Sequence, residues 1–135
     1  GIACAAVADM RPVNPANKKL HRGDLPDSIL LENTPDTLLE MGRTKSSHQV
    51  LMGFALETDS VEESLKSAES KLTRKNLDFV VMNTLADKGA GFNHDTNKVT
   101  VLQSVGPHTE KRIFELKTKR EVAYDLIELL STLLI

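Results

Sequence analysis

Runs of consecutive apolar residues alternate with polar, helix-like segments along much of the chain. Three of these runs lack polar alternation, which is typical of strands covered on both faces: Ile2 to Ala8, Val50 to Ala55 and Phe79 to Met82. A shorter run, Ser28 to Glu32, predicts a brief additional strand. Because strands separated by helices pair in parallel, we expect a sheet that is at least partly parallel.

The later part of the chain has a different pattern, with two strand-like segments separated by a turn. Val99 to Gln103 and Arg112 to Leu116 lie on either side of Gly106-Pro107. Glycine followed by proline is a strong turn signal, so these segments indicate a hairpin. The hairpin adds antiparallel strands to the expected sheet.

Three segments combine helix-start signals with helical spacing of apolar residues. Thr34-Pro35-Asp36 places a threonine N-cap before a proline at the first helical position, and this helix is expected to end at Gly42. Capping boxes at Ser60–Glu63 and Thr118–Glu121 predict two longer helices. The apolar stripes expected on these two helices are Val61, Leu65, Ala68 and Leu72, and Val122, Leu126, Ile127, Leu130 and Leu133.

Together these elements predict an α/β fold: a three-layer, Rossmann-like sheet, partly parallel, with an antiparallel hairpin near the carboxyl terminus. Residues 1–135 are enough for one core and contain no internal repeat or linker, so a single domain is expected. The chain opens directly on an apolar strand. We therefore expect it to be the carboxyl-terminal part of a larger domain.

Composition and charge narrow the classes of function. The chain is 40% hydrophobic and 27% charged, which is ordinary for a globular protein. A formal net charge of -2 argues against bulk attraction to nucleic acid or to a membrane, and no apolar run is long enough to cross a bilayer. The single cysteine, Cys4, favours a reducing compartment, so a cytoplasmic location is expected. Within an apolar strand, Cys4 is expected to be an inert buried thiol.

Basic residues gather in two places, and each cluster has two interpretations. The polar loop after the first strand either folds over a polyphosphate or is an ordinary solvated loop; its basic residues are Lys18, Lys19, His21 and Arg22. Lys71, Arg74 and Lys75 end the second helix, where cations complement the negative end of the macrodipole. Lys71 and Lys75 also share a helix face and repel each other, and a bound anion would relieve that repulsion.

Polar residues at strand ends are further candidates. Asp9 and Asn83 each end an apolar run, where ligands bind in open α/β sheets, although a turn or capping role explains each equally well. Asp87, His94 and Asp95 lie in a turn-rich segment without the spacing of a metal site, so no metal ligands are assigned.

Five motifs occur in order along almost the whole chain. They are AAVAD with Arg11-Pro12, NTPDTL, VLMGFALET, RKNLDFVVMN and GFNHDTNKVTV. In this order they resemble the phosphopantothenate–cysteine ligase family, also called phosphopantothenoylcysteine synthetase, of coenzyme A biosynthesis. In bacteria this ligase is usually the carboxyl-terminal half of a bifunctional protein, and the other half is an FMN-dependent decarboxylase.

The resemblance implies a reaction and an assembly. The bacterial enzymes use CTP with Mg²⁺ to activate the carboxylate of 4'-phosphopantothenate as an acyl cytidylate, with release of pyrophosphate. The amine of cysteine then attacks this intermediate, and CMP leaves. Such chemistry requires cations around the triphosphate and a cover that keeps water from the mixed anhydride. The family's homodimer, in which the flap of one subunit covers the other's site, is the implied assembly.

The resemblance also implies roles for individual positions. Lys19 matches the first lysine of the family's flap motif and is implied to act on the acyl cytidylate, which makes it the catalytic candidate. Asp9 is implied to recognise the cytosine or ribose. The other implied CTP contacts are Ala5 beside the nucleotide, the helix-start residues Pro35, Asp36, Thr37 and Leu38, Phe54 packed on the nucleotide, and Lys71 and Lys75 at the triphosphate.

The sequence departs from the family pattern in three respects. The flap motif, normally Lys-x-Lys-Lys, reads Lys19-Leu20-His21-Arg22, and Thr37 stands where isoleucine is usual. The family's Gly-rich segment and its acyl-cytidylate-binding asparagine have no counterpart, so the chain alone is expected not to complete the ligation. Two other interpretations therefore stay open: a non-catalytic remnant that only binds nucleotide or dimerises, and a plain structural domain.

Overall fold

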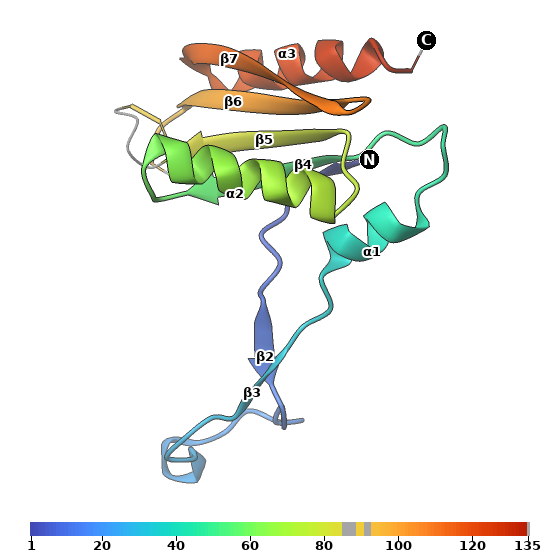
Figure 1. Ribbon diagram of the computed structural model, residues 1–135. Coiled ribbons are helices and arrows are strands. Elements are labelled where there is room, and N and C mark those ends of the chain that lie inside the picture. Colours follow the sequence, from blue (N-terminus) through green and yellow to red (C-terminus); the bar gives the residue numbers. More distant parts are fainter. Residues whose placement is uncertain (85–88, 91–92, 135) are drawn as a thin grey trace. The chain divides into compact units, whose positions relative to one another are not determined.

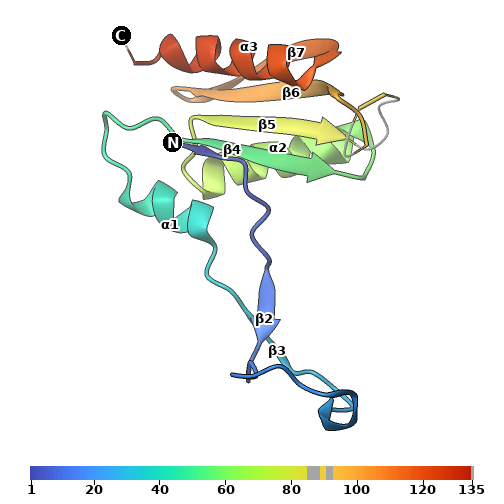
Figure 2. The same ribbon diagram turned by 180° about the vertical axis from the view of Figure 1, so that it is seen from behind.

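The computed structural model describes residues 1–84, 89–90 and 93–134, and the chain divides into two compact units. One unit comprises Gly1–Cys4 and the chain from Leu38 onward, and the other comprises Ala5–Thr37. The first contains a five-stranded sheet with its helices, and the second contains a two-stranded hairpin (Figures 1 and 2). That residues 1–135 form a single domain stays a prediction.

The sheet of the larger unit has the strand order β1-β4-β5-β6-β7. The first three strands in this order are parallel, whereas β6 is antiparallel to both of its neighbours. The strands are β1 (Ile2–Ala3), β4 (Met52–Glu57), β5 (Phe79–Thr84), β6 (Thr96–Val105) and β7 (His108–Thr118). The turn between β6 and β7 has Gly106 at a φ of 57°, a left-handed conformation that glycine adopts without strain. The partly parallel sheet and the antiparallel hairpin near the carboxyl terminus are both confirmed.

Helices α2 (Val61–Arg74) and α3 (Lys119–Ser131) cover opposite faces of this sheet, which gives three layers (Figures 1 and 2). The core on the α2 side consists of Leu51, Ala55, Ala68, Leu72, Leu77, Val80, Met82 and Leu102. The core on the α3 side consists of Met52, Phe79, Val81, Val99, Val101, Val122, Leu126, Leu129 and Leu130. Alternate residues of β5 enter the two cores because successive strand side chains point to opposite faces. The predicted α/β fold class is therefore confirmed.

The starts of both long helices are confirmed. Ser60 is the N-cap of α2 and accepts a hydrogen bond from the backbone N–H of Glu63 at 3.4 Å. Thr118 and Glu121 form a complete capping box at the start of α3. The Thr118 hydroxyl and the Thr118 backbone N–H both donate to the Glu121 carboxylate. These bonds lower the pKa of Glu121, the hydroxyl bond more than the backbone bond.

The predicted apolar stripes are wrong at three positions, because Val61, Ile127 and Leu133 are exposed. Val61 is the first residue of α2, and helical side chains tilt toward the amino terminus, so its side chain projects beyond the packed part of the helix. At roughly 100° per residue, Ile127 lies about 140° around the helix from the buried Val122, so its side chain is directed away from the core. Leu133 follows the end of α3 at Ser131.

The first apolar run is also not the buried strand that its composition predicts. Only Ile2–Ala3 is strand, Ile2 is 43% exposed, and the thiol of Cys4 is exposed rather than buried. The reason is that, among the described residues, β1 is an edge strand and pairs with β4. Small apolar residues indicate that a strand can be covered on both faces, but the neighbouring elements decide whether it is.

Helix α1 (Thr37–Thr44) differs from prediction at both ends. It begins after Pro35, and Gly42 lies buried inside it rather than ending it. At Gly42 the helix packs directly against the backbone of another segment, since an added Cβ would lie 1.8 Å from the carbonyl oxygen of Lys75. The predicted strand at 50–55 is shifted to Met52–Glu57, and that at 28–32 to β3 (Leu31–Asn33).

Candidate functional site

The smaller unit consists of an antiparallel hairpin and a long exposed loop. Its strands are β2 (Met10–Pro12) and β3, with Arg11 opposite Glu32. Arg11 Nε and Glu32 Oε1 lie 2.8 Å apart in an ion pair that is exposed to solvent. The loop between the strands contains a short 3-10 helix, η1 (Arg22–Asp24).

Thr34, in the motif NTPDTL, forms hydrogen bonds with the end of the motif AAVAD. Its backbone N–H donates to the carbonyl of Asp9 at 2.9 Å, and its hydroxyl donates to the carbonyl of Ala8. The segment that precedes Pro35 is therefore held beside the end of AAVAD. Thr34 does not cap α1 as predicted, because its hydroxyl is directed at Ala8.

Six of the predicted site residues lie in this smaller unit, and all are exposed: Ala5, Asp9, Lys19, Pro35, Asp36 and Thr37. The hydrogen bonds of Thr34 bring the backbone at Asp9 close to the helix-start segment. Lys19 lies in the loop between β2 and β3, with a solvent-exposed side chain. The link between these positions is made by the backbone of Asp9 and by Thr34, which is not itself a predicted site residue.

The other four predicted residues belong to the larger unit. Leu38 is partly buried and lies over Gly53 of β4, where an added Cβ would meet Leu38 Cδ2 at 2.7 Å. Phe54 of the same strand is 39% exposed. Lys71 and Lys75 are at the end of α2, as the sequence predicts.

Lys71 is bound to a carboxylate that the sequence analysis did not single out. Its Nζ lies 2.6 Å from Glu57 Oε1, and Ser67 Oγ donates to the same oxygen at 3.2 Å. The side chain of Glu57 is only 8% exposed, whereas that of Lys71 is 34% exposed. A carboxylate at the end of the apolar run VLMGFALE was the available signal, since buried acidic residues are almost always paired.

Lys75 is the C-cap of α2 and packs through its backbone. Its N–H donates to the carbonyl of Lys71 at 3.1 Å. The next residue, Asn76, has a φ of 50° and donates from its side-chain amide to the carbonyl of Gly42 at 2.9 Å. Asn76 therefore stops the helix and also ties α2 to α1.

Phe54 and Lys71 lie on opposite faces of the sheet. Met52 packs on the α3 side and Ala55 on the α2 side, so Phe54, two residues after Met52, points toward the α3 side. Glu57 points to the α2 side and meets Lys71 there. A ligand in contact with both Phe54 and Lys71 therefore has to pass the carboxyl end of β4.

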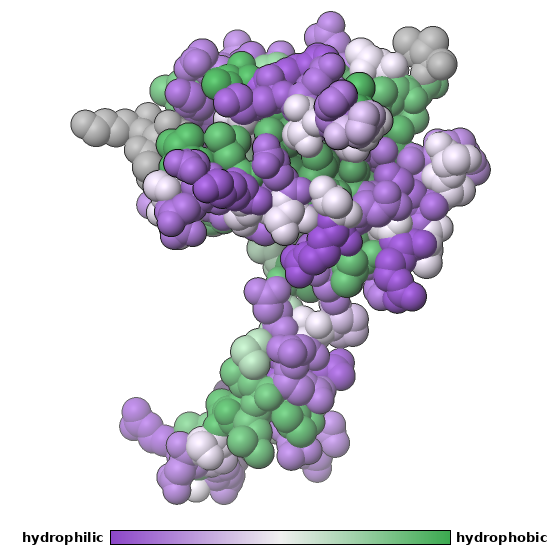
Figure 3. All heavy atoms as spheres, viewed as in Figure 1, coloured by the Kyte–Doolittle hydropathy of each residue, from purple (hydrophilic) through white to green (hydrophobic). Residues whose placement is uncertain are grey.

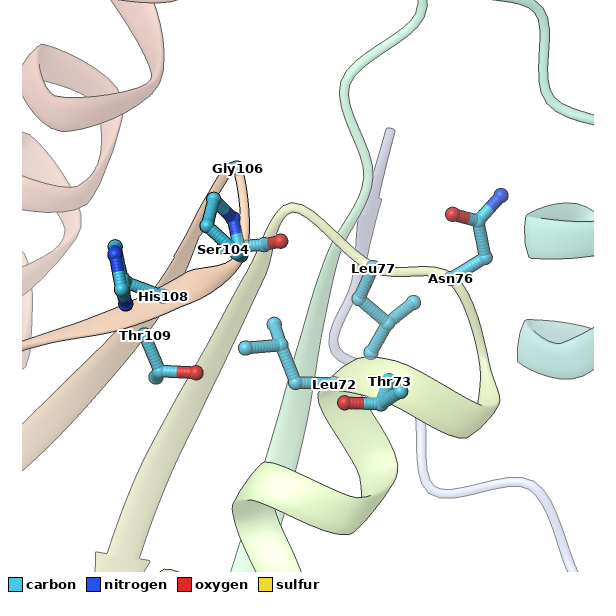
Figure 4. Close-up of a pocket in the computed structure, with 9 residues that line it drawn as sticks. Leu72, Thr73, Asn76, Leu77, Ser104, Gly106, His108 and Thr109 are labelled. Atoms are coloured by element: carbon cyan, nitrogen blue, oxygen red, sulfur yellow. The ribbon is translucent and has the colours of Figure 1, made fainter.

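One pocket of about 290 Å³ opens at the other end of the sheet, between α2 and the β6–β7 turn. Figure 4 shows the side chains around it, which come from α2, the segment that follows it, and the hairpin. The lining residues are Leu72, Thr73, Asn76, Leu77, Ser104, Gly106, Pro107, His108 and Thr109. None of the predicted site residues lines this pocket.

Metal-binding side chains are not grouped in the part of the chain that the structure describes: no three His, Cys, Asp or Glu residues converge there. The turn-rich segment weighed for metal binding is only partly described, and Asp87 lies outside the described residues. Among the described residues, no helix is long and apolar enough to cross a membrane.

The five-stranded, partly parallel sheet with helices on both faces defines an α/β domain. A sequence model of the DNA/pantothenate metabolism flavoprotein C-terminal domain matches residues 1–134. The chain belongs to this family. The family resemblance recognised in the motifs is thereby confirmed.

Individual relatives are similar to the chain over nearly its whole length. The coenzyme A biosynthesis bifunctional protein CoaBC of Bacillus subtilis (strain 168) is 36% identical over 132 residues, which cover 98% of this chain and 31% of that protein. A cysteine/cysteine sulfinic acid decarboxylase of an unknown prokaryotic organism is 47% identical over 132 residues, 98% of this chain and 35% of that protein. The crystal structure of the C-terminal domain of CoaBC matches with a TM-score of 0.67 and 37% identity, over 98% of this chain and 55% of that one. The chain thus spans about a third of the length of these two curated relatives.

Proposed function

We propose that this chain is the nucleotide-contacting part of a ligase that joins 4'-phosphopantothenate to cysteine in coenzyme A biosynthesis. CTP is the proposed co-substrate, and an acyl cytidylate is the proposed intermediate. The observation that carries the proposal is the match to CoaBC along nearly the whole chain, in sequence and in fold. The resemblance implies CTP contacts at nine positions and a catalytic role for Lys19, and most of these side chains are solvent-accessible.

The described residues suit the charge requirements of this chemistry. Lys19 is exposed on its loop, where a cation can reach developing negative charge on the acyl cytidylate. Lys71 and Lys75 supply positive charge on α2 for the triphosphate, and the N–H groups at the start of α1 supply polar donors. Mg²⁺ is proposed to be held mainly by the phosphate oxygens of CTP, because this ion prefers oxygen ligands and is commonly bound through substrate phosphates.

The ligase proposal is tested by pyrophosphate release. The chain replaces the matching segment of the Bacillus subtilis relative, and the chimera receives CTP, 4'-phosphopantothenate, cysteine and Mg²⁺. We expect release above background, and we expect Lys19→Ala in the chimera to lower kcat by at least about a hundredfold, as for the loss of a group that stabilises transition-state charge. A chimera that melts cooperatively yet releases no pyrophosphate would contradict the proposal.

A second candidate, the non-catalytic remnant, is favoured by two observations. The flap segment Lys19-Leu20-His21-Arg22 departs from the basic family pattern, and one close relative carries the name of a decarboxylase rather than a ligase. On this alternative the chain accompanies a decarboxylase half, which would be the only part that uses FMN. CTP binding without pyrophosphate release from the chimera would favour this alternative.

We also propose that the chain forms homodimers through its smaller unit. Large apolar side chains gather on that unit and are exposed, as Figure 3 shows from one side. They are Val7, Met10, Val13, Leu20, Leu25, Ile29, Leu30 and Leu31, with exposures from 41% to 72%. Exposed apolar residues in such number on a small unit are typical of an interaction surface.

Leu30→Asp is expected to convert the dimer to a monomer, because it places a charge at the most exposed of these positions, which is 72% exposed. Sedimentation velocity measures the change, and a weakening of dimerisation by at least about tenfold is expected for a buried charge at an interface. Val61→Asp is the matched control, since Val61 is 67% exposed but belongs to α2. A wild-type chain that sediments only as a monomer would overturn the dimer proposal.

A further inference from the structure

Glu57 differs from every other charged residue in the described part of the chain, because it alone is buried. It is the last residue of β4, and its Oε1 accepts hydrogen bonds from Lys71 Nζ and Ser67 Oγ of α2. A buried carboxylate is strongly destabilising unless charged or polar partners compensate it. Both partners come from one helix, so the contact fixes α2 against the end of β4.

The same contact fixes the position of the Lys71 ammonium. A lysine side chain in water populates many rotamers, and an anion that binds it has to restrict them. Here the restriction exists before any ligand arrives, because Nζ is already 2.6 Å from Glu57. An ammonium group has three N–H donors, and with 34% of the Lys71 side chain exposed it can still reach an anion from the solvent side.

We propose that Glu57 is a positioning residue for Lys71. Its carboxylate, fixed in turn by Ser67, holds the ammonium at the carboxyl end of β4, the edge of a parallel sheet at which ligands bind. The inference rests on the proposed function, in which Lys71 contacts the triphosphate of CTP. Glu57 acts through Lys71 and does not touch the nucleotide.

Positioning and simple electrostatics predict opposite effects when the carboxylate is removed. A negative charge beside Lys71 repels a triphosphate, so its loss strengthens CTP binding if charge alone matters. If Glu57 mainly positions the ammonium, its loss weakens binding despite the relieved repulsion. The sign of the change therefore distinguishes the two roles.

Isothermal titration of the chain with CTP and Mg²⁺ tests the inference. Glu57→Leu is expected to weaken CTP binding roughly tenfold, and Glu57→Gln roughly threefold, because the amide oxygen still accepts from Lys71. In a Lys71→Met background, Glu57→Leu is expected to change CTP affinity by less than about twofold, since residues that act as a unit are not additive.

Glu62→Gln is the matched control, because Glu62 pairs with Lys66 on the same helix but both side chains are at least 70% exposed. It is expected to leave CTP affinity unchanged. If circular dichroism shows that Glu57→Leu is unfolded, Glu57→Gln and Ser67→Ala carry the test, with about twofold weaker binding expected for Ser67→Ala.

Tighter or unchanged CTP binding by Glu57→Gln would overturn the inference, as would an equal loss from Glu57→Leu with and without Lys71. A wild-type chain that binds no CTP would instead refute the proposed nucleotide site, and the inference would fall with it. Wild-type binding in the same titration therefore separates a failure of the inference from a failure of the proposed function.

Discussion

Replacing Gly42 with alanine is expected to lower the free energy of unfolding by about 3 kcal/mol or more, the range of severe overpacking. The added Cβ would lie 1.8 Å from the carbonyl oxygen of Lys75 and 2.8 Å from its carbonyl carbon. Both atoms are backbone, so no side-chain rotation relieves the overlap. Either α1 or the end of α2 has to move, and the hydrogen bond from Asn76 to Gly42 is disturbed with it.

Urea unfolding followed by circular dichroism measures this effect. Gly23→Ala is the control, because nothing lies within 4 Å of a Cβ at that position. The control is expected to shift the free energy of unfolding by less than about 0.5 kcal/mol, as for ordinary surface substitutions. Equal stabilities of the two variants would show that α1 does not pack on α2 through Gly42.

Replacing Asp78 with alanine is expected to have the second-largest effect, a loss of about 3 kcal/mol of stability, as when one partner of a largely buried ion pair is removed. One carboxylate oxygen, Oδ2, accepts from Lys45 Nζ at 2.7 Å and from the backbone N–H of Leu51 at 2.6 Å. The Lys45 side chain is only 13% exposed, so the variant leaves its ammonium with little compensation from water.

The same unfolding measurement includes two comparison variants. Asp78→Asn keeps an oxygen acceptor and is expected to lose roughly half as much stability, because hydrogen bonds survive while the charge does not. Glu40→Ala removes an exposed ion pair with Arg43, whose side chains are 54% and 69% exposed, and is expected to cost under about 0.5 kcal/mol. If Asp78→Ala and Glu40→Ala lower the free energy of unfolding equally little, the ion pair between Asp78 and Lys45 does not hold the start of β5 to the segment that precedes β4.

The central elements of the fold could be predicted because their signals are local. The capping residues Ser60 and Thr118 lie next to the helices that they start, and the run at Phe79 is apolar enough to be buried in any α/β sheet. Burial at Ile2 could not be predicted in this way. Whether an apolar strand is covered depends on neighbours elsewhere in the sequence, and in the part of the chain that the structure describes β1 lies at the sheet edge beside β4.

In the candidate site, too, local sequence signals could be predicted and long-range contacts could not. Motif resemblance indicated which residues to consider, including Lys71, without indicating which protein side chains they contact. The partner of Lys71 is Glu57, fourteen positions earlier, and the pair exists only because α2 packs across the end of β4. Thr34 likewise looked like a helix cap from its spacing, but the hairpin directs its hydroxyl to Ala8.

The pairing of β1 with β4 has a consequence for the order in which the larger unit assembles. β6 and β7 are joined by a tight turn, so their register requires only a short loop to close. β1 pairs with a strand that begins at Met52, and the whole of Ala5–Thr37 lies in the chain between them. Because long loops close at a greater entropic cost and pair more slowly, we expect the hairpin to form early. We therefore expect β1 to join the sheet after this hairpin has formed.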